Sequence, residues 1–304
     1  MKKKKVIAIV GPTAVGKTAL GIKLANQLGG EIISGDSLQV YKSLEIGTAK
    51  ATKEEQAQAT HHLIDVRELN ESYSVADFQK EGRKLIEEIN LPIIVGGTGL
   101  YVQSLLEDYS LGGQTENNSL RQKYQAYLEE KGKEALWHLL NEKDPIAAQI
   151  IHQNNSRKII RALEVFENTG KSIINADGQD SLSLYDCKII GLITDRELLY
   201  TRINQRIDQM LNQDLLEEAK MLFDKYPNAQ AAQGIGYKEF FPYFKGESSL
   251  DECVELVKKN SRNYAKRQIT WFRNRMDTHW IDIIQNPVEI EKQIHDLELW
   301  LADK

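Results

Sequence analysis

The residues with the clearest chemistry lie near the start of the sequence, where Gly11 to Thr18 read GPTAVGKT. This spacing matches the P-loop form G-x-x-x-x-G-K-S/T, in which backbone N–H groups and a helix N-terminus hold phosphate oxygens. Lys17 adds a positive charge, and the hydroxyl of Thr18 can ligate Mg²⁺. A chance glycine turn is the alternative, but the apolar run KVIAIV before the motif and the amphipathic stretch after it supply the required strand and helix. We therefore expect a phosphate-binding loop, although the motif alone does not say whether the phosphates belong to a nucleotide.

The acid that a P-loop ATPase normally uses has no clear counterpart. Such enzymes carry an apolar strand that ends in Asp or Asp-Glu, which holds Mg²⁺ and aligns water. Here IIVGGTG ends in glycines, and Asp65 lies in the short, ambiguous run HLIDV. The clearest acid at a predicted strand end is Asp36, after EIISG. Ligands of parallel sheets gather at such strand ends, which favours a site role for Asp36, while turn capping is the alternative.

A second glycine-rich loop, GGTGLY, follows the predicted strand LPIIV. Glycines 96, 97 and 99 would let the main chain come close to a ligand or to the first loop, and Thr98 and Tyr101 offer hydroxyls. A tight strand-to-helix turn explains the same spacing equally well.

Cysteine and histidine spacings indicate structural roles. Cys187 and Cys253 lie far apart without a CxxC pattern, which argues against a disulfide framework and a zinc site. His61 and His62 are adjacent and lack the i, i+4 spacing of a helical metal pair.

The charge distribution points to a polyanionic partner although the net charge is -5. The segment from Lys258 to Arg275 has seven basic residues and no acidic one, and Tyr264, Trp271 and Phe272 are interleaved with them. Charge beside aromatic surface suits an RNA backbone with stackable bases. A solvated helix face is the alternative, but such a face normally carries both signs. A second basic cluster has Arg157 and Arg161 at i, i+4.

The arrangement of these motifs predicts an α/β fold. Short β-branched runs alternate with helical stretches in the first third of the chain, which is typical of a mainly parallel sheet flanked by helices. The three polar or glycine-rich loops should therefore converge on one pocket. Between 115 and 185 the pattern turns helical, so we expect a discontinuous core (1–114 and 186–304) with a helical insertion domain (115–185). No run is long and apolar enough for a membrane helix, and we expect a cytoplasmic protein.

Seven segments, in order along the whole chain, resemble the bacterial tRNA dimethylallyltransferase family: GPTAVGKT, GDSLQVYKSLEIGTAK, HHLIDV, GGTGLY, RKIIRALE, GIGYKE and AKRQITWFR. Val15 and Ala51 stand where the family more often has Ser and Pro. The resemblance implies a P-loop NTPase-like core and the transfer of a dimethylallyl group from dimethylallyl diphosphate to N6 of the adenine immediately 3′ of the anticodon. Diphosphate is then the leaving group, so no water needs to be aligned.

Residue roles follow from the resemblance. Asp36 accepts or orients the N6 proton as the general base. Mg²⁺ is the cofactor, and the catalytic residue Thr18 ligates it or touches the bridging region of the diphosphate. Arg206 contacts the diphosphate, in preference to Arg202, because it directly precedes an I-D-x-M pattern. The diphosphate-binding residues are Gly11, Pro12, Thr13, Ala14, Val15, Gly16, Lys17 and Thr18.

The resemblance also implies that the target adenine is flipped out of the anticodon loop, while the insertion domain clasps the anticodon stem-loop. We expect a monomer with these tRNA contacts: Asp36, Ser37, Leu38, Gln39, Thr98, Arg121, Arg157, Arg161, Gly236, Tyr237, Lys266, Arg267, Gln268, Trp271 and Arg273.

Two other functions compete. A P-loop nucleoside or nucleotide kinase would turn over ATP and would not need a basic helix near the C-terminus. A nucleotide-gated RNA-binding switch would bind tRNA without prenyl transfer, and it would leave Asp36 without a role.

Overall fold

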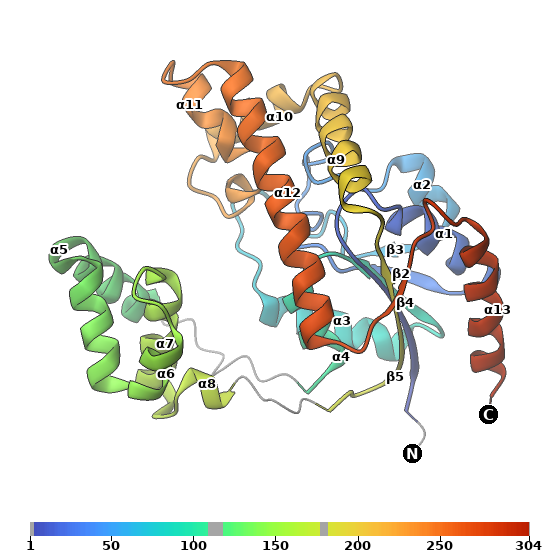
Figure 1. The fold of residues 1–304 in the computed structure, drawn as a ribbon, viewed down its shortest axis with the longest axis horizontal. Helices are drawn as coiled ribbons and strands as arrows, with labels where there is room; N and C mark the ends of the chain where they lie inside the picture. Colours follow the sequence, from blue (N-terminus) through green and yellow to red (C-terminus); the bar gives the residue numbers. More distant parts are fainter. Residues whose placement is uncertain (1–2, 109–117, 177–181, 304) are drawn as a thin grey trace. The chain divides into compact units, whose positions relative to one another are not determined.

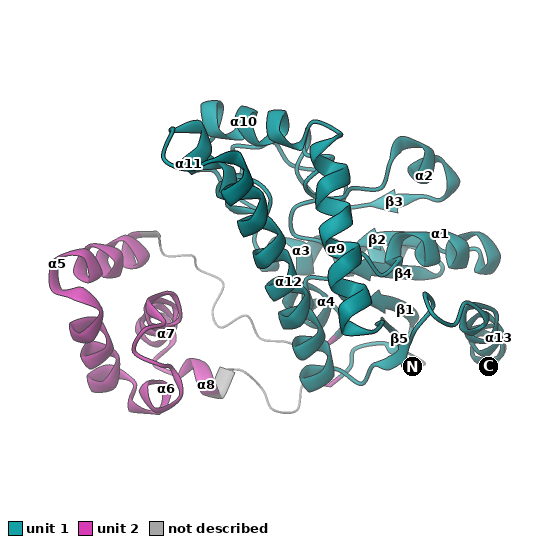
Figure 2. Cartoon of the chain, turned by 45° about the horizontal axis from the view of Figure 1, so that its top comes forward, with its two compact units in different colours: residues 1–106, 183–304 teal, residues 107–182 magenta. Residues whose placement is uncertain are grey.

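A computed structural model of the chain describes residues 3–108, 118–176 and 182–303, which fall into two compact units. Unit 1 comprises the residues up to 106 and from 183 onward, and unit 2 comprises 107–182 (Figure 2). The expected boundary at 114/115 lies outside the described residues. The expected boundary at 185/186 lies close to the observed return to unit 1 at Ser183.

Unit 1 is built on a six-stranded sheet in the order β3-β2-β4-β1-β5-β6, and every described strand pair is parallel. The central strands are nearly continuous apolar runs because helices cover both faces of the sheet. This confirms the predicted α/β class. The strands are β1 (Lys5–Val10), β2 (Glu31–Ser34), β3 (His61–His62), β4 (Pro92–Gly96), β5 (Asp186–Leu192) and β6 (His279–Ile281).

Helices flank this sheet, with α1 and α13 on one side and α3, α4 and α12 on the other (Figure 1). Long α12 packs along α9 and against α4. The helices of unit 1 are α1 (Lys17–Leu28), α2 (Lys53–Gln58), α3 (Val75–Glu88), α4 (Gly99–Leu106), α9 (Arg196–Leu211), α10 (Leu215–Lys225), α11 (Phe241–Phe244), α12 (Leu250–Arg275) and α13 (Val288–Ala302), with 3₁₀ turns at Ala231–Gln233 and Lys238–Phe240.

Local signals place several helix ends where the sequence predicts them. Gly29 adopts a left-handed conformation (φ 69°) as the C-cap of α1. Ser74 and Asp77 form a reciprocal capping box that starts α3. The end of α1 and the start of α3 are therefore fixed by short-range interactions.

Unit 2 is helical throughout its described part, with α5 (Asn118–Lys143), α6 (Pro145–Ile150), α7 (Ser156–Thr169) and α8 (Ile173–Ala176). Leu136 and Leu140 of α5 pack with Ile159 and Leu163 of α7 in a core of its own. α5 is interrupted at Gly132, whose φ of 83° is not helical. Within the described ranges of both units, no helix meets the length and apolar character needed to cross a membrane.

Candidate active site

The loops after β1, β2 and β4 line one cavity of about 1260 Å³ in unit 1. The P-loop supplies part of one wall with Thr13, Ala14, Gly16, Lys17 and Thr18, Asp36 lies on another, and Gly96 and Gly97 come from the second glycine loop. α9 and α12 complete the cavity with Arg202, Arg206, Tyr264 and Gln268, among others. The predicted convergence of the three loops is confirmed.

The P-loop has the backbone form that phosphate binding requires. Gly16 is left-handed (φ 93°) at the N-cap of α1. Gly11 lies so close to β5 that a Cβ there would be 2.4 Å from the carbonyl oxygen of Leu192, so only glycine fits. The Nζ of Lys17 donates to the carbonyl of Pro12 at 2.5 Å, and Val15 is buried beneath the loop. The N–H groups at the start of α1 are thus available to an anion on the cavity side.

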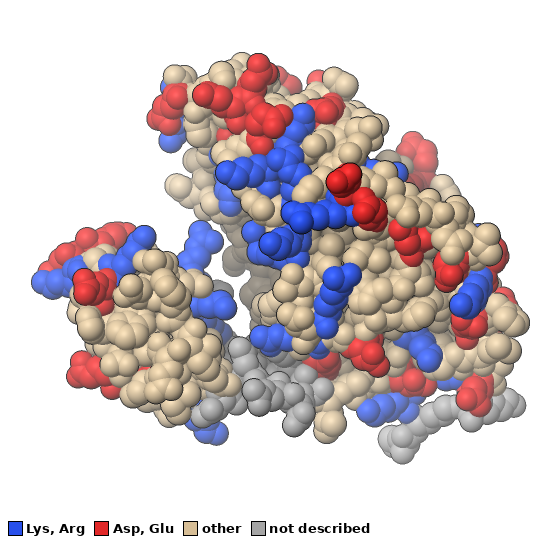
Figure 3. All heavy atoms as spheres, viewed as in Figure 1, with Lys and Arg blue, Asp and Glu red and all other residues tan. Residues whose placement is uncertain are grey.

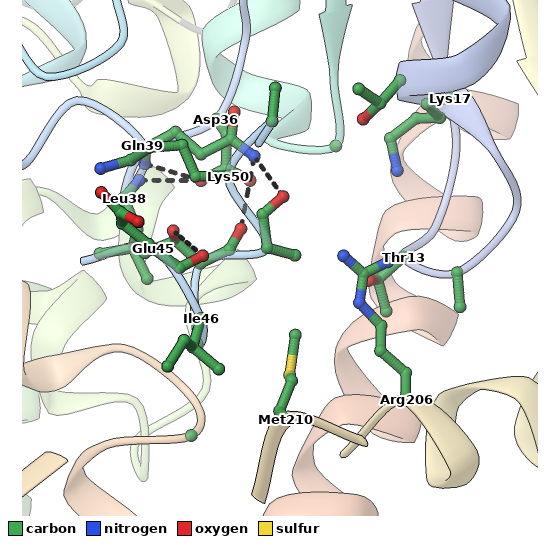
Figure 4. Close-up of a pocket in the computed structure, with 18 of the residues that line it drawn as sticks. Thr13, Lys17, Asp36, Leu38, Gln39, Glu45, Ile46, Lys50, Arg206 and Met210 are labelled. Carbon is green, nitrogen blue, oxygen red and sulfur yellow. Dashed lines mark hydrogen bonds between the residues drawn. The ribbon is translucent and has the colours of Figure 1, made fainter. Parts of the chain in front are cut away.

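Two arginines of α9 take different positions beside this loop. Arg202 donates through Nε to the carbonyl of Ala14 at 2.9 Å, which ties the loop to α9. Arg206 lies in the cavity near Lys17, and Figure 4 shows both side chains with Thr13 on one side of the cavity. Burial first, and then the positive charge of Arg206, lower the pKa of Lys17 to about 8, and Asp36 opposes the shift. Burial also lowers the pKa of Arg206, against the attraction of Glu55 and Asp36. These crowded cations form a site for a polyanion.

Asp36 faces this cationic wall from the other side of the cavity (Figure 4). Its Oδ1 accepts the backbone N–H groups of Leu38 at 2.8 Å and Gln39 at 3.4 Å. The turn-capping role that the sequence left open is therefore present alongside the site position. Burial raises the pKa of Asp36, and the two N–H bonds and Lys17 oppose the rise. A carboxylate with a raised pKa is well suited to accept a proton.

The neighbours of Asp36 are held by short polar contacts. Thr98 accepts the N–H of Ser37 through Oγ1 at 3.3 Å. The phenol of Tyr264 lies near Asp36, Thr98 and Gln268. Burial first, and then Asp36, raises the pKa of Tyr264 to about 12. The sequence marks Tyr264 only as part of a basic, aromatic helix, and nothing in it reveals this inward position.

The second glycine loop is a close-packed strand-to-helix turn. A Cβ at Gly96 would lie 2.3 Å from the carbonyl oxygen of Gly35, and one at Gly97 would lie 2.1 Å from Nε2 of Gln268. That Nε2 donates to the carbonyl of Gly97 at 2.9 Å. A Cβ at Gly99 would lie 2.3 Å from Cδ1 of Trp271. These glycines therefore allow the approach of β2 and α12 to the loop.

α12 presents a basic surface in unit 1, and Figure 3 shows Lys and Arg side chains along its course. The exposed basic residues are Lys259, Lys266, Arg267, Arg273 and Arg275. The indole of Trp271 contributes to a shallow hollow between Lys266, Arg267 and Arg275. A basic hollow with an aromatic wall suits a nucleic acid strand.

Other residues of the predicted basic stripe turn out to face the protein. Lys258 pairs with Asp208 of α9 at 2.8 Å, and Arg262 donates to Oδ1 of Asn204 at 2.6 Å. Phe272 is fully buried, so the interpretation of this ring as a stacking surface is wrong. The segment from Lys258 to Arg275 contains no acidic residue, but α9 provides Asp208 as the partner of Lys258.

Two of the predicted tRNA contacts are also buried. Tyr237 is 0% exposed, and its hydroxyl donates to Glu218 at 2.6 Å, so its side chain is not offered to RNA. Gln268 is 5% exposed and lies on the cavity wall. Gly236, beside Tyr237, also lines the cavity with its backbone. These side chains shape the site from within.

The three arginines of unit 2 that were predicted to contact tRNA differ in their surroundings. Arg157 is exposed near the start of α7. Arg121 and Arg161 both pair with the buried carboxylate of Glu164, at 2.9 and 3.4 Å. Glu164 therefore fixes two of the three guanidinium groups on one face of this unit.

The cavity wall also fits a magnesium ion that is brought with phosphate. Within the described residues, no group of three or more His, Cys, Asp or Glu side chains could hold a metal. Mg²⁺ usually takes few protein ligands and completes its shell with phosphate oxygens and water. Thr18 lines the cavity, and its hydroxyl is of the type that could serve as one such ligand.

Apolar side chains also line the same cavity, and of these the sequence pointed only to Leu38, as a tRNA contact. Leu38 and Ile46 line it on the same side as Asp36, and Met210 is directed into the space between Ile46 and Arg206 (Figure 4). Only the I-D-x-M pattern hints at Met210, and Ile46 has no local signal because its loop reaches the cavity through long-range packing.

Comparisons with known proteins identify the family that the chain resembles. A family model described as IPP transferase matches residues 39–275. The tRNA dimethylallyltransferase of Enterococcus faecalis is 59% identical, over 99% of each chain. That of Bacillus licheniformis is 49% identical, over 99% of this chain and 98% of its own.

Two solved structures share the fold. The full-length tRNA isopentenylpyrophosphate transferase of Bacillus halodurans is 44% identical, with a TM-score of 0.73, covering 97% of this chain and 96% of that one. A eukaryotic dimethylallyltransferase acting on tRNA is 32% identical, with a TM-score of 0.77, covering 92% of this chain and 74% of that one.

Proposed function

The chain belongs to the IPP transferase family, whose members prenylate tRNA, and from that premise we propose how its cavity carries out the transfer. It is a transferase that acts on tRNA. The donor in our proposal is dimethylallyl diphosphate, and the acceptor is N6 of the adenine immediately 3′ of the anticodon.

The P-loop holds the diphosphate of the donor. Its N–H groups, Lys17 and Arg206 would bind the diphosphate oxygens and stabilise the negative charge that builds on them as the C–O bond breaks. Mg²⁺, held by Thr18 and the diphosphate oxygens, would supply further charge neutralisation to this leaving group. The absence of an ATPase-type acid fits a diphosphate that leaves without attack by water.

The apolar wall receives the dimethylallyl tail. Ile46 and Met210 lie beside the space between the cations and Asp36, and Leu38 lines the cavity on the Asp36 side. A five-carbon tail in this position would keep its first allylic carbon beside the diphosphate, in the cavity that Asp36 also lines.

Asp36 acts on the acceptor. The N6 amine attacks the allylic carbon, a C–N bond forms as the C–O bond to diphosphate breaks, and Asp36 accepts the N6 proton. The adenine reaches this position only when it is flipped out of the anticodon loop, at modest cost for an unpaired base. Exposed Lys266 and Arg267 on α12 would hold the RNA backbone near the cavity.

One observation carries the proposal: Asp36 and the cations Lys17 and Arg206 face each other across a single cavity. This arrangement serves a reaction in which a proton leaves on one side and a diphosphate leaves on the other. We further propose that the enzyme works as a monomer in the cytoplasm, where it meets its tRNA.

The test is transfer without nucleotide. Unmodified tRNA, labelled dimethylallyl diphosphate and Mg²⁺ are incubated with the protein in the absence of ATP, and the label is followed into RNA. Labelled N6-prenyl adenosine is the expected product. A well-folded protein that transfers no label, or that hydrolyses ATP and phosphorylates a nucleoside instead, would sink the proposal.

A further inference from the structure

Glu218 of α10 caps the turn at Glu45–Gly47, which is far from it in the sequence. Its Oε2 accepts the backbone N–H groups of Glu45 at 2.7 Å and Ile46 at 3.1 Å. Its Oε1 accepts the N–H of Gly47 at 2.9 Å and the hydroxyl of Tyr237 at 2.6 Å. Each oxygen thus accepts two donors. In the described part of the chain no Lys or Arg lies within ion-pair distance of this carboxylate.

The contact between Glu218 and the turn is closely built. Tyr237 is fully buried, and a Cβ on Gly47 would lie 2.7 Å from its ring. Only glycine lets the turn reach the carboxylate past this ring. A surface ion pair would not need a buried ring packed against a glycine. We therefore read the contact between Glu218 and the turn as one that fixes the turn.

The other end of the same turn holds the neighbour of Asp36. The Nε2 of Gln39 donates hydrogen bonds to the carbonyls of Thr48 and Ala49, at 3.3 and 3.2 Å. The Oε1 of Gln39 accepts the hydroxyl of Ser34 at 2.8 Å. The side chain of Gln39 is therefore held on both sides, and its backbone N–H is one of the two that bond to Asp36.

The turn also carries a residue of the apolar wall. Ile46, whose N–H is bound by Glu218, lines the cavity opposite the cations. The carboxylate of Glu218 thus sets the position of Gln39, which supports Asp36 on the acceptor side, and of Ile46, which would contact the donor.

We propose that Glu218 is a positioning residue for prenyl transfer: by capping the turn at Glu45–Gly47 it fixes Gln39 behind Asp36 and Ile46 against the prenyl tail. This inference rests on the proposed function, because it assigns Asp36 and Ile46 their roles in that reaction. Glu218 itself is not among the residues that line the cavity, so it would act through the turn and not by touching a substrate.

The primary test compares Glu218→Gln with Glu217→Gln, a change at the adjacent, exposed position. Glutamine keeps the size of Glu218, but whichever way its amide turns, an NH₂ group faces two of the four donors. A misplacement of about 1 Å can cost 10²-fold in rate, so we expect kcat to fall by roughly 10- to 100-fold in Glu218→Gln. Glu217→Gln should keep the wild-type kcat.

The pH profile separates positioning from simple stabilisation. The N–H bonds from Leu38 and Gln39 lower the pKa of Asp36, so loosening Gln39 should raise it. The acidic limb of kcat should then move to higher pH in Glu218→Gln, while the Kd for tRNA stays unchanged. A lower melting temperature with unaltered kcat and acidic limb would show a purely structural role and overturn the proposal.

Tyr237→Phe gives a milder second probe if Glu218→Gln folds poorly. It removes one of the four donors, and its effect on kcat should be smaller and non-additive with Glu218→Gln, because both act through one carboxylate. Full additivity, or no effect of either change, would contradict the proposal. Wild-type protein without transfer would instead refute the proposed function, so the two failures are distinguishable.

Discussion

Arg202 ties the P-loop to α9 by donating from Nε to the carbonyl oxygen of Ala14 at 2.9 Å. Arg206, four residues further along the same helix, lies in the cavity with Lys17 instead of against the loop backbone. The two arginines, of which the sequence resemblance favoured Arg206 for the diphosphate, thus have different surroundings. One secures the loop, and the other is placed to meet the diphosphate.

This difference makes the arginines separable by mutation. Arg206→Ala should lower kcat/KM for dimethylallyl diphosphate by roughly 10²-fold, the scale of losing one donor to a developing anion. Arg202→Ala should lower the melting temperature and raise KM, with a smaller effect on kcat, because it loosens the loop. Steady-state kinetics of both variants decide the point, and an Arg206→Ala enzyme with wild-type kinetics would remove Arg206 from the reaction.

Lys17 should impose an alkaline limit on donor capture. Its pKa is lowered to about 8, so in the free enzyme the ammonium loses its charge as the pH rises through that value. We expect kcat/KM for dimethylallyl diphosphate to fall above about pH 8, since this parameter reports the free enzyme. The kcat should persist to higher pH because the bound diphosphate favours the charged form of Lys17. In Lys17→Arg the side chain stays charged, so the fall of kcat/KM above about pH 8 should disappear. If the fall persists in this variant, it has an origin other than Lys17.

The apolar wall should set the length of the prenyl donor. Met210→Ala opens space next to Ile46, so we expect the preference for dimethylallyl over geranyl diphosphate to fall by about 10-fold, within the usual range for apolar pockets. Competition between the two donors measures the ratio. Met221→Ala is the matched control, because Met221 packs against the core outside the cavity. An unchanged ratio in Met210→Ala would place the tail elsewhere.

The exposed part of α12 should contribute salt-dependent tRNA binding. Lys266→Ala and Arg267→Ala should each weaken tRNA binding and reduce the slope of log K against log salt by about 1. Lys258→Ala should leave the slope unchanged, because Lys258 is paired with Asp208 and turned toward α9. Equal slopes in all three variants would argue against α12 as the RNA surface.

The parts of the site that follow from sequence are those that depend on local patterns. The P-loop, the cap at Gly29 and the Ser74 capping box are short-range features, and the sheet then brings the strand ends together because its strands are parallel. Asp36 could be placed for the same reason.

The remaining features depend on contacts between distant residues. Glu218 meets the turn at Glu45–Gly47 across more than 170 residues, and no local pattern announces that pairing. The inward turn of Tyr237 and the pairing of Lys258 with α9 likewise follow from packing. Sequence motifs mark a segment as part of the site, but packing decides which side chains reach the substrate.

The proposed mechanism depends above all on Asp36 taking the proton of the attacking amine across the cavity from the P-loop. Its most direct test is a single turnover of wild-type protein and Asp36→Asn, each preloaded with unmodified tRNA and mixed with labelled dimethylallyl diphosphate and Mg²⁺. We expect the Asp36→Asn variant to bind both substrates with near wild-type affinity but to transfer the label roughly 10²- to 10⁴-fold more slowly, the usual contribution of a general base. Transfer at the wild-type rate by this variant would contradict the role of Asp36 as the base.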